Sequence, residues 1–280
     1  MTGSWIRLAV RPSNVDLRDA VSVALFASGA QGLHEDGDWL VTHLEPAAPI
    51  DPFLVAVRAA DADAAVETGL VPPVDWTAMM RERIVSHQLG SLTVTPPWLA
   101  DQFDPATTIV IEPAMAFGTG EHPTTRGVVR LMQAEIRSGD TVADLGAGSA
   151  VLSIAAAKLG AMRVAAIELD ADAIGNAEEN VVRNHVVGRV SVLEGDAAVF
   201  LPLFAPVRVV LANIISSVLL ELLPVIAASL APDGVAILSG ILGEEREMML
   251  AALDAGGWVV RAEDAEEQWW SVTVARRAHG

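Results

Sequence analysis

The sequence predicts an α/β protein, with a parallel sheet that ends in an antiparallel hairpin and a small α+β domain before it. From Thr108 onward, apolar strands alternate with helical segments, as in parallel sheets covered on both faces. The last two expected strands, WVVRAED and QWWSVTVARR, are too close together for a crossover helix. They should therefore pair as a hairpin at the sheet edge.

The first 72 residues predict a small ferredoxin-like βαββαβ domain. Apolar alternation predicts strands, and helical periodicity after the capping residue Asn14 predicts the first helix. The expected strands are Trp5–Val10, two strands around Asp36-Gly37, and Val66–Val71, and the second expected helix is Pro52–Ala60.

Residues 73–104 are expected to connect this domain to the larger one, which spans 105–280. Pro72-Pro73 marks the boundary, VDWTAMMRERIVSHQ predicts a connecting helix, and SLTVT predicts a strand. The strands expected in the larger domain are TIVIE, TVADL, RVAAIEL, RVSVLEG and RVVLANI, with helices from about His122, after Ser149 and over Ala171–Asn184.

Composition excludes several classes of function. The chain has 280 residues and no cysteine, so a disulfide framework, a thiolate nucleophile and a cysteine zinc site are excluded. No apolar run reaches the roughly 18 to 20 residues of a membrane span, and MTGSWIRLAV does not resemble a secretory signal. A net charge of -18 argues against direct binding of nucleic acid. We therefore expect a cytoplasmic monomer without membrane or nucleic-acid partners.

A glycine turn after TVADL is the strongest local signal in the chain. Gly146 and Gly148 let a ligand approach the backbone between Asp144 and the helix after Ser149, whose free N–H groups favour negative charge. The next strand ends at Glu168, about twenty residues on, where an acid can accept the ribose hydroxyls of an adenine nucleoside. This spacing predicts a Rossmann-like nucleotide site, although Glu168 could instead cap the following helix.

Asp196 follows the third strand of this series, after Glu194-Gly195. Its side chain could meet the adenine amino group of a nucleotide. An exposed turn aspartate is the alternative interpretation, and the sequence leaves both open.

The stretch AFGTGEHPTT, residues 116–125, raises three ligand hypotheses. A Walker phosphate loop is excluded because its Gly-Lys-Ser/Thr sequence is missing and Lys158, the sole lysine, lies within a predicted helix. A metal site at Glu121 and His122 is disfavoured because adjacent side chains rarely converge on one ion, so no metal is expected. The departure from G-x-G-x-x-G and the closing hairpin favour S-adenosylmethionine over a dinucleotide, which stays possible.

Several motifs in one order resemble a known family. They are AFGTGEHPTT, VADLGAGSAVLSIAAAKLGA, VAAIELDADAI, ENVVRN, LEGD, VVLANII and LSGIL. Over residues 75 to 276 the chain resembles the PrmA family, the methyltransferases of large-subunit ribosomal protein eleven. The resemblance implies a class I S-adenosylmethionine-dependent methyltransferase that modifies lysine side-chain and N-terminal amines of this basic protein. Residues 1–72 would be its substrate-recognition domain.

The resemblance also implies a set of cofactor-binding residues. AFGTGEHPTT would fold over the methionyl side of the cofactor with His122 close by, although a packed loop without a ligand is the alternative. Two residues depart from the family pattern. Ala150 stands where such turns often have a third glycine, and Glu121 stands where the family more often has a neutral residue. The cofactor-binding candidates are Phe117, Gly118, Thr119, Gly120, Thr124, Asp144, Gly146, Gly148, Glu168, Asp196 and Asn213.

Asn213 and Thr119 are the catalytic candidates. Asn213 ends the fourth strand of the series, where its amide oxygen could accept an amine N–H. It resembles the asparagine of the N-P-P-Tyr motif of amino methyltransferases, with Ile214 and Ile215 in place of the prolines. Alternatively, Asn213 caps the helix that follows.

Overall fold

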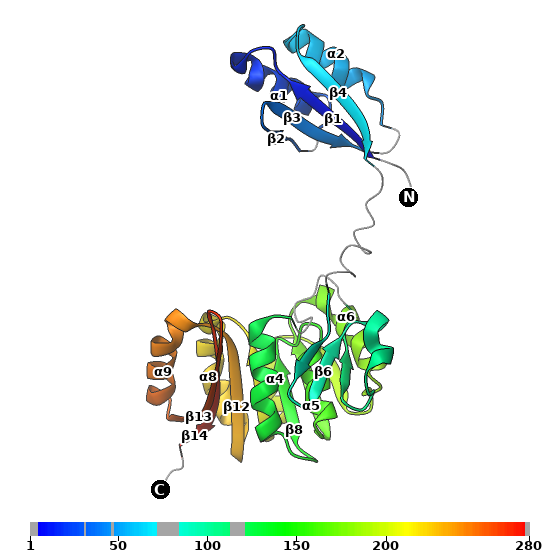
Figure 1. Cartoon of the computed structure of the whole chain (residues 1–280). Helices are drawn as coiled ribbons and strands as arrows, with labels where there is room; N and C mark the ends of the chain where they lie inside the picture. The colour runs from blue at the N-terminus through cyan, green and yellow to red at the C-terminus, as the bar shows by residue number, and fades with distance from the viewer. Residues whose placement is uncertain (1–4, 31, 46–47, 72–83, 113–120, 278–280) are drawn as a thin grey trace. The chain divides into compact units, whose positions relative to one another are not determined.

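The computed structural model describes residues 5–30, 32–45, 48–71, 84–112 and 121–277. The chain divides into two compact units, Met1–Arg83 and Ile84–Gly280 (Figure 1). Most of the expected connecting helix, 74–88, lies outside the described residues, and His87 at its end belongs to a strand instead.

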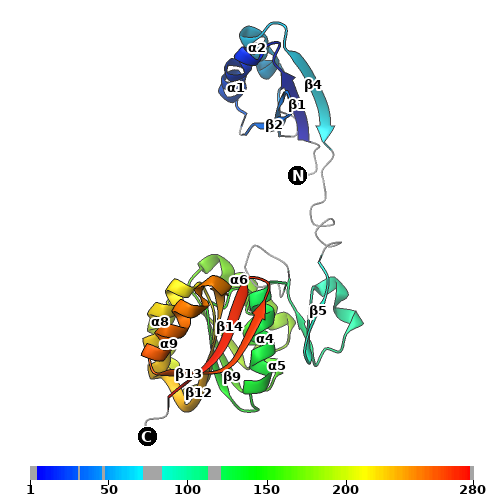
Figure 2. The same cartoon turned by 60° about the vertical axis from the view of Figure 1, so that its left-hand side comes forward.

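Unit 1 has the predicted βαββαβ order. Its antiparallel sheet runs β2-β3-β1-β4, and α1 and α2 lie together over one face (Figures 1 and 2). Leu8 and Val10 of β1 pack against Val21 of α1 and Val57 of α2 in a buried core. The elements are β1 (Trp5–Arg11), η1 (Val15–Leu17), α1 (Arg18–Ala27), β2 (His34–Asp36), β3 (Trp39–Leu44), α2 (Asp51–Ala60) and β4 (Ala65–Val71).

Unit 2 is built on a seven-stranded sheet in the order β10-β9-β8-β11-β12-β14-β13. The first five strands are parallel, and β14 pairs antiparallel with both β12 and β13, so the predicted terminal hairpin is confirmed. The strands are β8 (Thr141–Leu145), β9 (Arg163–Glu168), β10 (Val190–Glu194), β11 (Val207–Asn213), β12 (Leu230–Leu242), β13 (Trp258–Glu266) and β14 (Trp269–Arg276).

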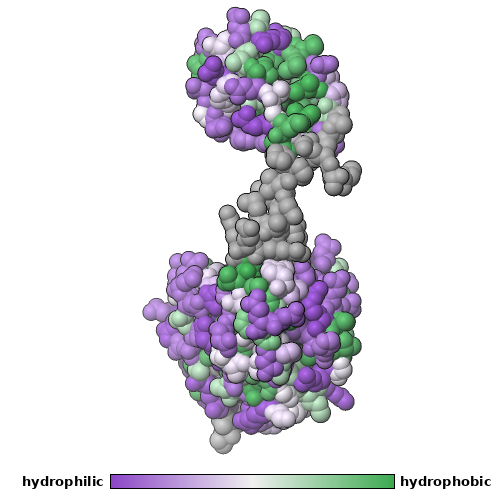
Figure 3. All heavy atoms as spheres, turned by 45° about the vertical axis from the view of Figure 1, so that its right-hand side comes forward, coloured by the Kyte–Doolittle hydropathy of each residue, from purple (hydrophilic) through white to green (hydrophobic). Residues whose placement is uncertain are grey.

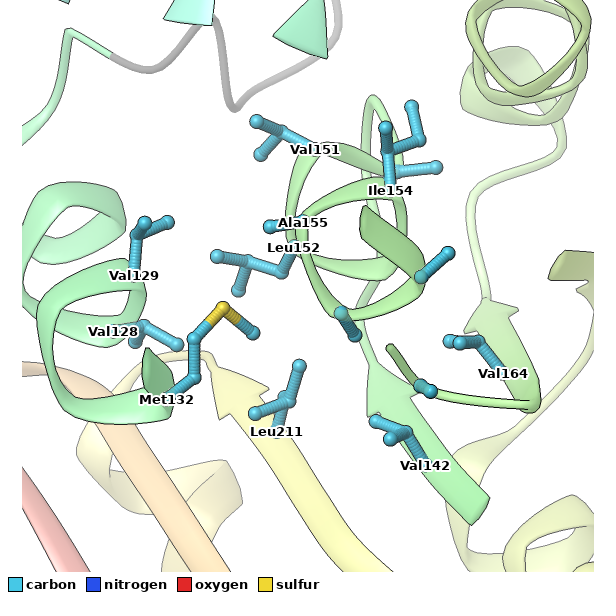
Figure 4. Close-up of a cluster of buried hydrophobic side chains, with 14 of the residues drawn as sticks. Val128, Val129, Met132, Val142, Val151, Leu152, Ile154, Ala155, Val164 and Leu211 are labelled. Carbon is cyan, nitrogen blue, oxygen red and sulfur yellow. The ribbon is translucent and has the colours of Figure 1, made fainter. Parts of the chain in front are cut away.

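Helices supply a separate apolar core to each face of this sheet. On one face, Val128 and Met132 of α4 meet Leu152 of α5 and Leu211 of β11 (Figure 4). On the other face, α8 and α9 cover the sheet. The helices are α4 (Pro123–Glu135), α5 (Val151–Lys158), α6 (Ala171–Arg183), α7 (Ala197–Phe200), α8 (Ser216–Ser229) and α9 (Arg246–Ala255), with short 3-10 turns η2 (Pro97–Gln102), η3 (Leu201–Phe204) and η4 (Gly243–Glu245).

The strand expected in TIVIE lies outside the seven-stranded sheet, which corrects the prediction. It is β7 (Thr108–Val110), the edge of a small sheet with β5 (His87–Leu89) and β6 (Leu92–Thr95). β8 already has β9 and β11 on its two edges. Asn184, the C-cap of α6, accepts from the N–H of Val110 at 2.8 Å and donates to the C=O of Val110 at 2.7 Å. Residues 84–104 of the expected connecting segment thus belong to unit 2.

No helix in the described part of the chain is long and apolar enough to cross a membrane. Hydrophilic side chains cover most of the face of unit 2 that Figure 3 shows. The cytoplasmic location stays a prediction.

Candidate functional site

A cavity of about 390 Å³ lies at the carboxyl ends of the parallel strands in unit 2. This is where ligands bind in open α/β sheets. The ends of β8, β9 and β11 and the first turns of α4 and α5 contribute to its wall. Its lining residues are His122, Thr124, Thr125, Gly146, Ala147, Gly148, Val151, Leu152, Glu168, Asn213, Ile214, Ile215, Gly240 and Trp269.

The turn between β8 and α5 requires an unusual backbone. Gly146 and Gly148 have φ of 67° and 53°, and Ala150, at the N-cap of α5, has a φ of 64°. A Cβ on Gly146 would lie 3.1 Å from Cγ1 of Ile214. Glycine at position 146 therefore permits both the left-handed backbone conformation and the close approach of Ile214, which follows β11. The departure at Ala150 is a buried alanine in a left-handed conformation.

Glu168, the last residue of β9, bonds to this turn. One of its carboxylate oxygens accepts a hydrogen bond from the N–H of Gly148 at 2.7 Å, and the other accepts from the N–H of Asp170 at 2.9 Å. The cap of α6 is Asp170, which accepts from the N–H of Asp172 at 3.0 Å. The helix-cap alternative for Glu168 is thus wrong, and its carboxylate lies in the cavity wall.

Asp144 is a fully buried acid at the end of β8. Its Oδ2 accepts a hydrogen bond from the Ser153 hydroxyl at 2.6 Å, and its Oδ1 has no partner within the described residues. Burial raises the pKa of this carboxyl to about 7, and the nearby charge of Glu168 acts in the same direction. Asp144 bonds to α5 through Ser153 and is not among the lining residues of the cavity.

Asn213 is the last residue of β11 and lines the cavity. The following helix begins at Ser216 and has Ile215 as its N-cap, so the alternative in which Asn213 caps this helix is wrong. Within the described part of the chain, no hydrogen bond engages its side-chain amide. That amide can therefore serve a ligand in the cavity.

His122, Thr124 and Trp269 form another part of the cavity wall. His122 caps α4, and its Nδ1 shares a hydrogen bond with the Thr124 hydroxyl at 2.7 Å. The rings of His122 and Trp269 meet edge to face, with centroids 4.8 Å apart. Burial lowers the pKa of His122, and the charge of Arg126 adds to this effect. A neutral imidazole is the favoured form near pH 7.

Residues 49–277 match a family model described as Ribosomal protein L11 methyltransferase (PrmA). The chain belongs to this family. It is 37% identical over 216 residues to a ribosomal protein L11 methyltransferase of Pelotomaculum thermopropionicum, covering 76% of this chain and 70% of the relative. A ribosomal protein L11 methyltransferase of Exiguobacterium sibiricum is 38% identical over 188 residues, covering 67% of this chain and 59% of the relative.

A solved structure supports the same assignment. The ribosomal protein L11 methylase of Lactobacillus delbrueckii subsp. bulgaricus is 27% identical, with a TM-score of 0.60 over 70% of this chain and all of that one. The predicted α/β fold, a class I methyltransferase sheet with a terminal hairpin, is therefore confirmed, as is the resemblance to this family.

The predicted site residues of this family member fall into three groups. Thr124, Gly146, Gly148, Glu168 and Asn213 come together around the cavity. Asp144 and Asp196 do not line it: Asp144 is buried near the end of β8, and Asp196 is an exposed N-cap of α7 that accepts a hydrogen bond from the N–H of Ala198 at 2.8 Å. The cofactor roles remain predictions for all of them. Phe117, Gly118, Thr119 and Gly120 lie outside the described residues.

Sequence reasoning missed Trp269 and Gly240 in the cavity wall. Gly240 has a φ of 81°, and a Cβ there would lie 2.5 Å from the carbonyl oxygen of Ile214. Neither residue belongs to a nucleotide-binding pattern, and pairing of β12 with β14 brings their strands together. The LSGIL stretch contained a signal, an isolated glycine within an apolar strand, which often marks a close approach. In the described part of the chain, no three His, Asp or Glu residues are grouped to hold a metal ion.

Proposed function

We propose that this chain transfers methyl groups from S-adenosylmethionine to lysine side-chain and N-terminal amines of ribosomal protein L11. The observation that carries the proposal is the meeting of a glycine turn, an acid and an asparagine around one cavity. Gly146 and Gly148 follow β8, Glu168 ends β9, and Asn213 ends β11. The names of the relatives supply the protein substrate.

The lining residues fit the proposed cofactor. The two glycines leave room for a ligand beside the main chain, and each oxygen of Glu168, having accepted one backbone N–H, retains capacity for a ribose hydroxyl. Val151, Leu152 and Ile214 offer apolar surface to a ring. When bound, S-adenosylmethionine supplies an electrophilic methyl group.

The amine must lose a proton before it can attack. A free lysine has a pKa of about 10.4, so forming its neutral amine at pH 7 costs about 4 to 5 kcal/mol. Apolar residues such as Ile214 and Ile215 lower that cost by removing water from the ammonium group. The proton can leave through water, so the proposal requires no dedicated base.

Asn213 would aim the nucleophile. Its amide oxygen accepts an amine N–H, which directs the nitrogen lone pair toward the methyl carbon and away from the solvent. Alignment of this kind can supply a large part of a rate enhancement without any proton transfer. Thr119 remains the second catalytic candidate, and Phe117, Gly118 and Gly120 remain cofactor-binding candidates.

The test is transfer of labelled methyl from S-adenosylmethionine to purified ribosomal protein L11, with mass mapping of the product. We expect label on amino groups, and a loss of at least about tenfold in kcat/KM for Asn213→Ala, as one lost hydrogen bond of about 1.4 kcal/mol requires. Asn176→Ala is the matched control, because this α6 residue does not line the cavity.

Failure can be assigned to one part of the proposal. If the wild-type protein binds the cofactor but leaves L11 unlabelled and labels other proteins, the substrate assignment is wrong and a related amine methyltransferase is the better description. If Asn213→Ala retains full activity on L11, the role of Asn213 is wrong while the activity stands.

A further inference from the structure

Arg126 joins two segments that are far apart in the chain. It lies one helical turn after His122, and its guanidinium donates to the carbonyl oxygen of Glu121. The same group donates from Nε to Oε1 of Glu266 at 2.9 Å, 140 positions away at the end of β13. The side chains of Arg126 and Glu266 are only 18% and 29% exposed, so this ion pair is poorly screened by water.

Arg130, one turn further along α4, extends the pair into a cluster. Its Nε donates to Oδ2 of Asp264 at 2.8 Å, and its Nη2 donates to Oε2 of Glu266 at 2.7 Å. Two arginines of one helix thus bind two acids of β13 through charge-assisted hydrogen bonds. Arg130 holds Glu266 without help from Arg126, whereas among these cluster residues only Arg126 also reaches Glu121.

A second contact holds α4 against β14. A Cβ on Gly127 would lie 2.6 Å from Oγ of Ser271, so only glycine lets the helix approach this closely. The Ser271 hydroxyl shares a buried hydrogen bond with Ser239 of β12 at 2.7 Å. The helix is therefore attached to the hairpin by both the ion cluster and this packing.

Arg126 also pairs with Glu267 at 3.9 Å, but its two closer partners each adjoin a cavity residue. Glu121 directly precedes His122, and Glu266 is the cross-strand partner of Trp269 in the β13–β14 ladder. His122 and Trp269 both line the cavity, with ring centroids 4.8 Å apart. The Arg126 guanidinium thus binds the backbone carbonyl next to His122. It also binds the residue that lies opposite Trp269 in the β13–β14 ladder.

We infer that Arg126 is a positioning residue for methyl transfer, which holds His122 and Trp269 at their separation in the cavity wall by binding Glu121 and Glu266 together. The inference rests on the proposed methyl transfer but not on any particular protein substrate. A purely structural role would be to stabilise the hairpin, which Arg130 and the Gly127–Ser271 packing also do.

Three variants separate the two roles. Arg126→Gln removes the charge and the fork, and Arg126→Lys keeps the charge but cannot reproduce the planar fork that reaches both partners. Arg246→Gln is the matched control, because Arg246 pairs with Glu263 at 2.7 Å on the same hairpin and lies outside the cavity wall. For each variant we would measure the melting temperature and the kcat and KM of methyl transfer. Calorimetry would give the Kd for S-adenosylhomocysteine.

We expect Arg126→Gln to lower kcat/KM at least tenfold and to weaken binding of S-adenosylhomocysteine several-fold. Arg126→Lys should fall between it and the wild type, and Arg246→Gln should keep wild-type kinetics and binding at a comparable loss of melting temperature. Nuclear magnetic resonance provides a readout independent of turnover. Removal of the Arg126 charge should raise the pKa of His122, because that charge helps to lower it.

Unchanged kinetics and binding in Arg126→Gln, or losses no larger than those of Arg246→Gln, would overturn the inference. If Arg126→Gln does not fold, Glu266→Gln replaces it, since it removes the charge, keeps one oxygen acceptor and replaces the other by an NH2 group that cannot accept from an arginine. It should produce the same losses of kcat/KM and of S-adenosylhomocysteine binding at smaller size, and wild-type binding and kinetics in that variant would equally reject the inference. If wild-type protein fails to methylate L11, the proposed function fails, while the binding of S-adenosylhomocysteine still decides the role of Arg126.

Discussion

Glu168 accepts a hydrogen bond from the backbone N–H of Gly148 at 2.7 Å, which joins the end of β9 to the turn after β8. The other carboxylate oxygen accepts from the N–H of Asp170. The two bonds orient the acid beside the glycine turn, in the wall of the cavity. A cofactor that binds there would meet an acceptor held in place before it arrives.

Glu168→Gln should therefore weaken S-adenosylmethionine binding. Replacing a charged acceptor by a neutral amide removes part of a charge-assisted hydrogen bond worth about 1.5 to 3 kcal/mol, so we expect about a tenfold higher Kd. Calorimetric titration measures it. Glu178→Gln, on the exposed side of α6, is the control, and equal Kd values for the two variants would contradict a cofactor role for Glu168.

Gly146→Ala should destabilise unit 2 by about 1 to 2 kcal/mol, the usual cost of a left-handed non-glycine residue. The new methyl group would also press on Ile214. Ala150→Gly is the informative comparison, because relief of the left-handed strain is offset by greater chain entropy and a lost buried methyl group. We expect that change to stay within about 1 kcal/mol in urea unfolding. A Gly146→Ala protein as stable as wild type would show that the turn can relax.

Asp144→Asn should change how stability depends on pH. Burial raises the pKa of Asp144 in the folded state to about 7 from 3.8, so the folded protein binds this proton more tightly than the unfolded chain. Stability contributed by the group is present below about pH 4 and is lost as pH rises through about 7. Relative to wild type, the asparagine variant should thus gain stability over this range, by up to about 4 kcal/mol at 1.36 kcal/mol per pKa unit.

Urea unfolding at pH 4.5, 6 and 8 measures this difference, with exposed Asp172→Asn as the control. If the free energy of unfolding of Asp144→Asn differs from that of the wild type by the same amount at all three pH values, the carboxyl is ionised at little cost in the folded protein.

Charge on unit 1 should set the rate at which a basic protein substrate associates. The chain carries a net charge of -18, and Asp16, Asp19 and Glu67 are exposed acids of unit 1. Changing all three to lysine should slow association with ribosomal protein L11 several-fold at low salt and little at high salt. Stopped-flow mixing checks this, with Asp172, Glu178 and Glu179 of α6 reversed as a control. An association rate without salt dependence would reject electrostatic steering.

Local pattern was sufficient for most elements and for the centre of the site. The strand–turn–helix sequence around Gly146 and Gly148, Glu168 after the next strand, and the closing hairpin follow from residue periodicity and spacing. The reason is that these features depend on neighbours within about twenty residues. Carboxyl ends of parallel strands meet at one edge, so the approach of Asn213 to the same cavity also followed from order alone.

Which distant segments pair with each other could be seen only in the tertiary structure. β7 reads as a strand of the main sheet, yet both edges of β8 are occupied and β7 pairs with β6 instead. Trp269 enters the cavity wall, and Glu266 reaches Arg126, only through the register of β14 against β12 and β13. Register and pairing are chosen by the packing of whole faces, an energy summed over residues far apart in sequence, which no local pattern contains.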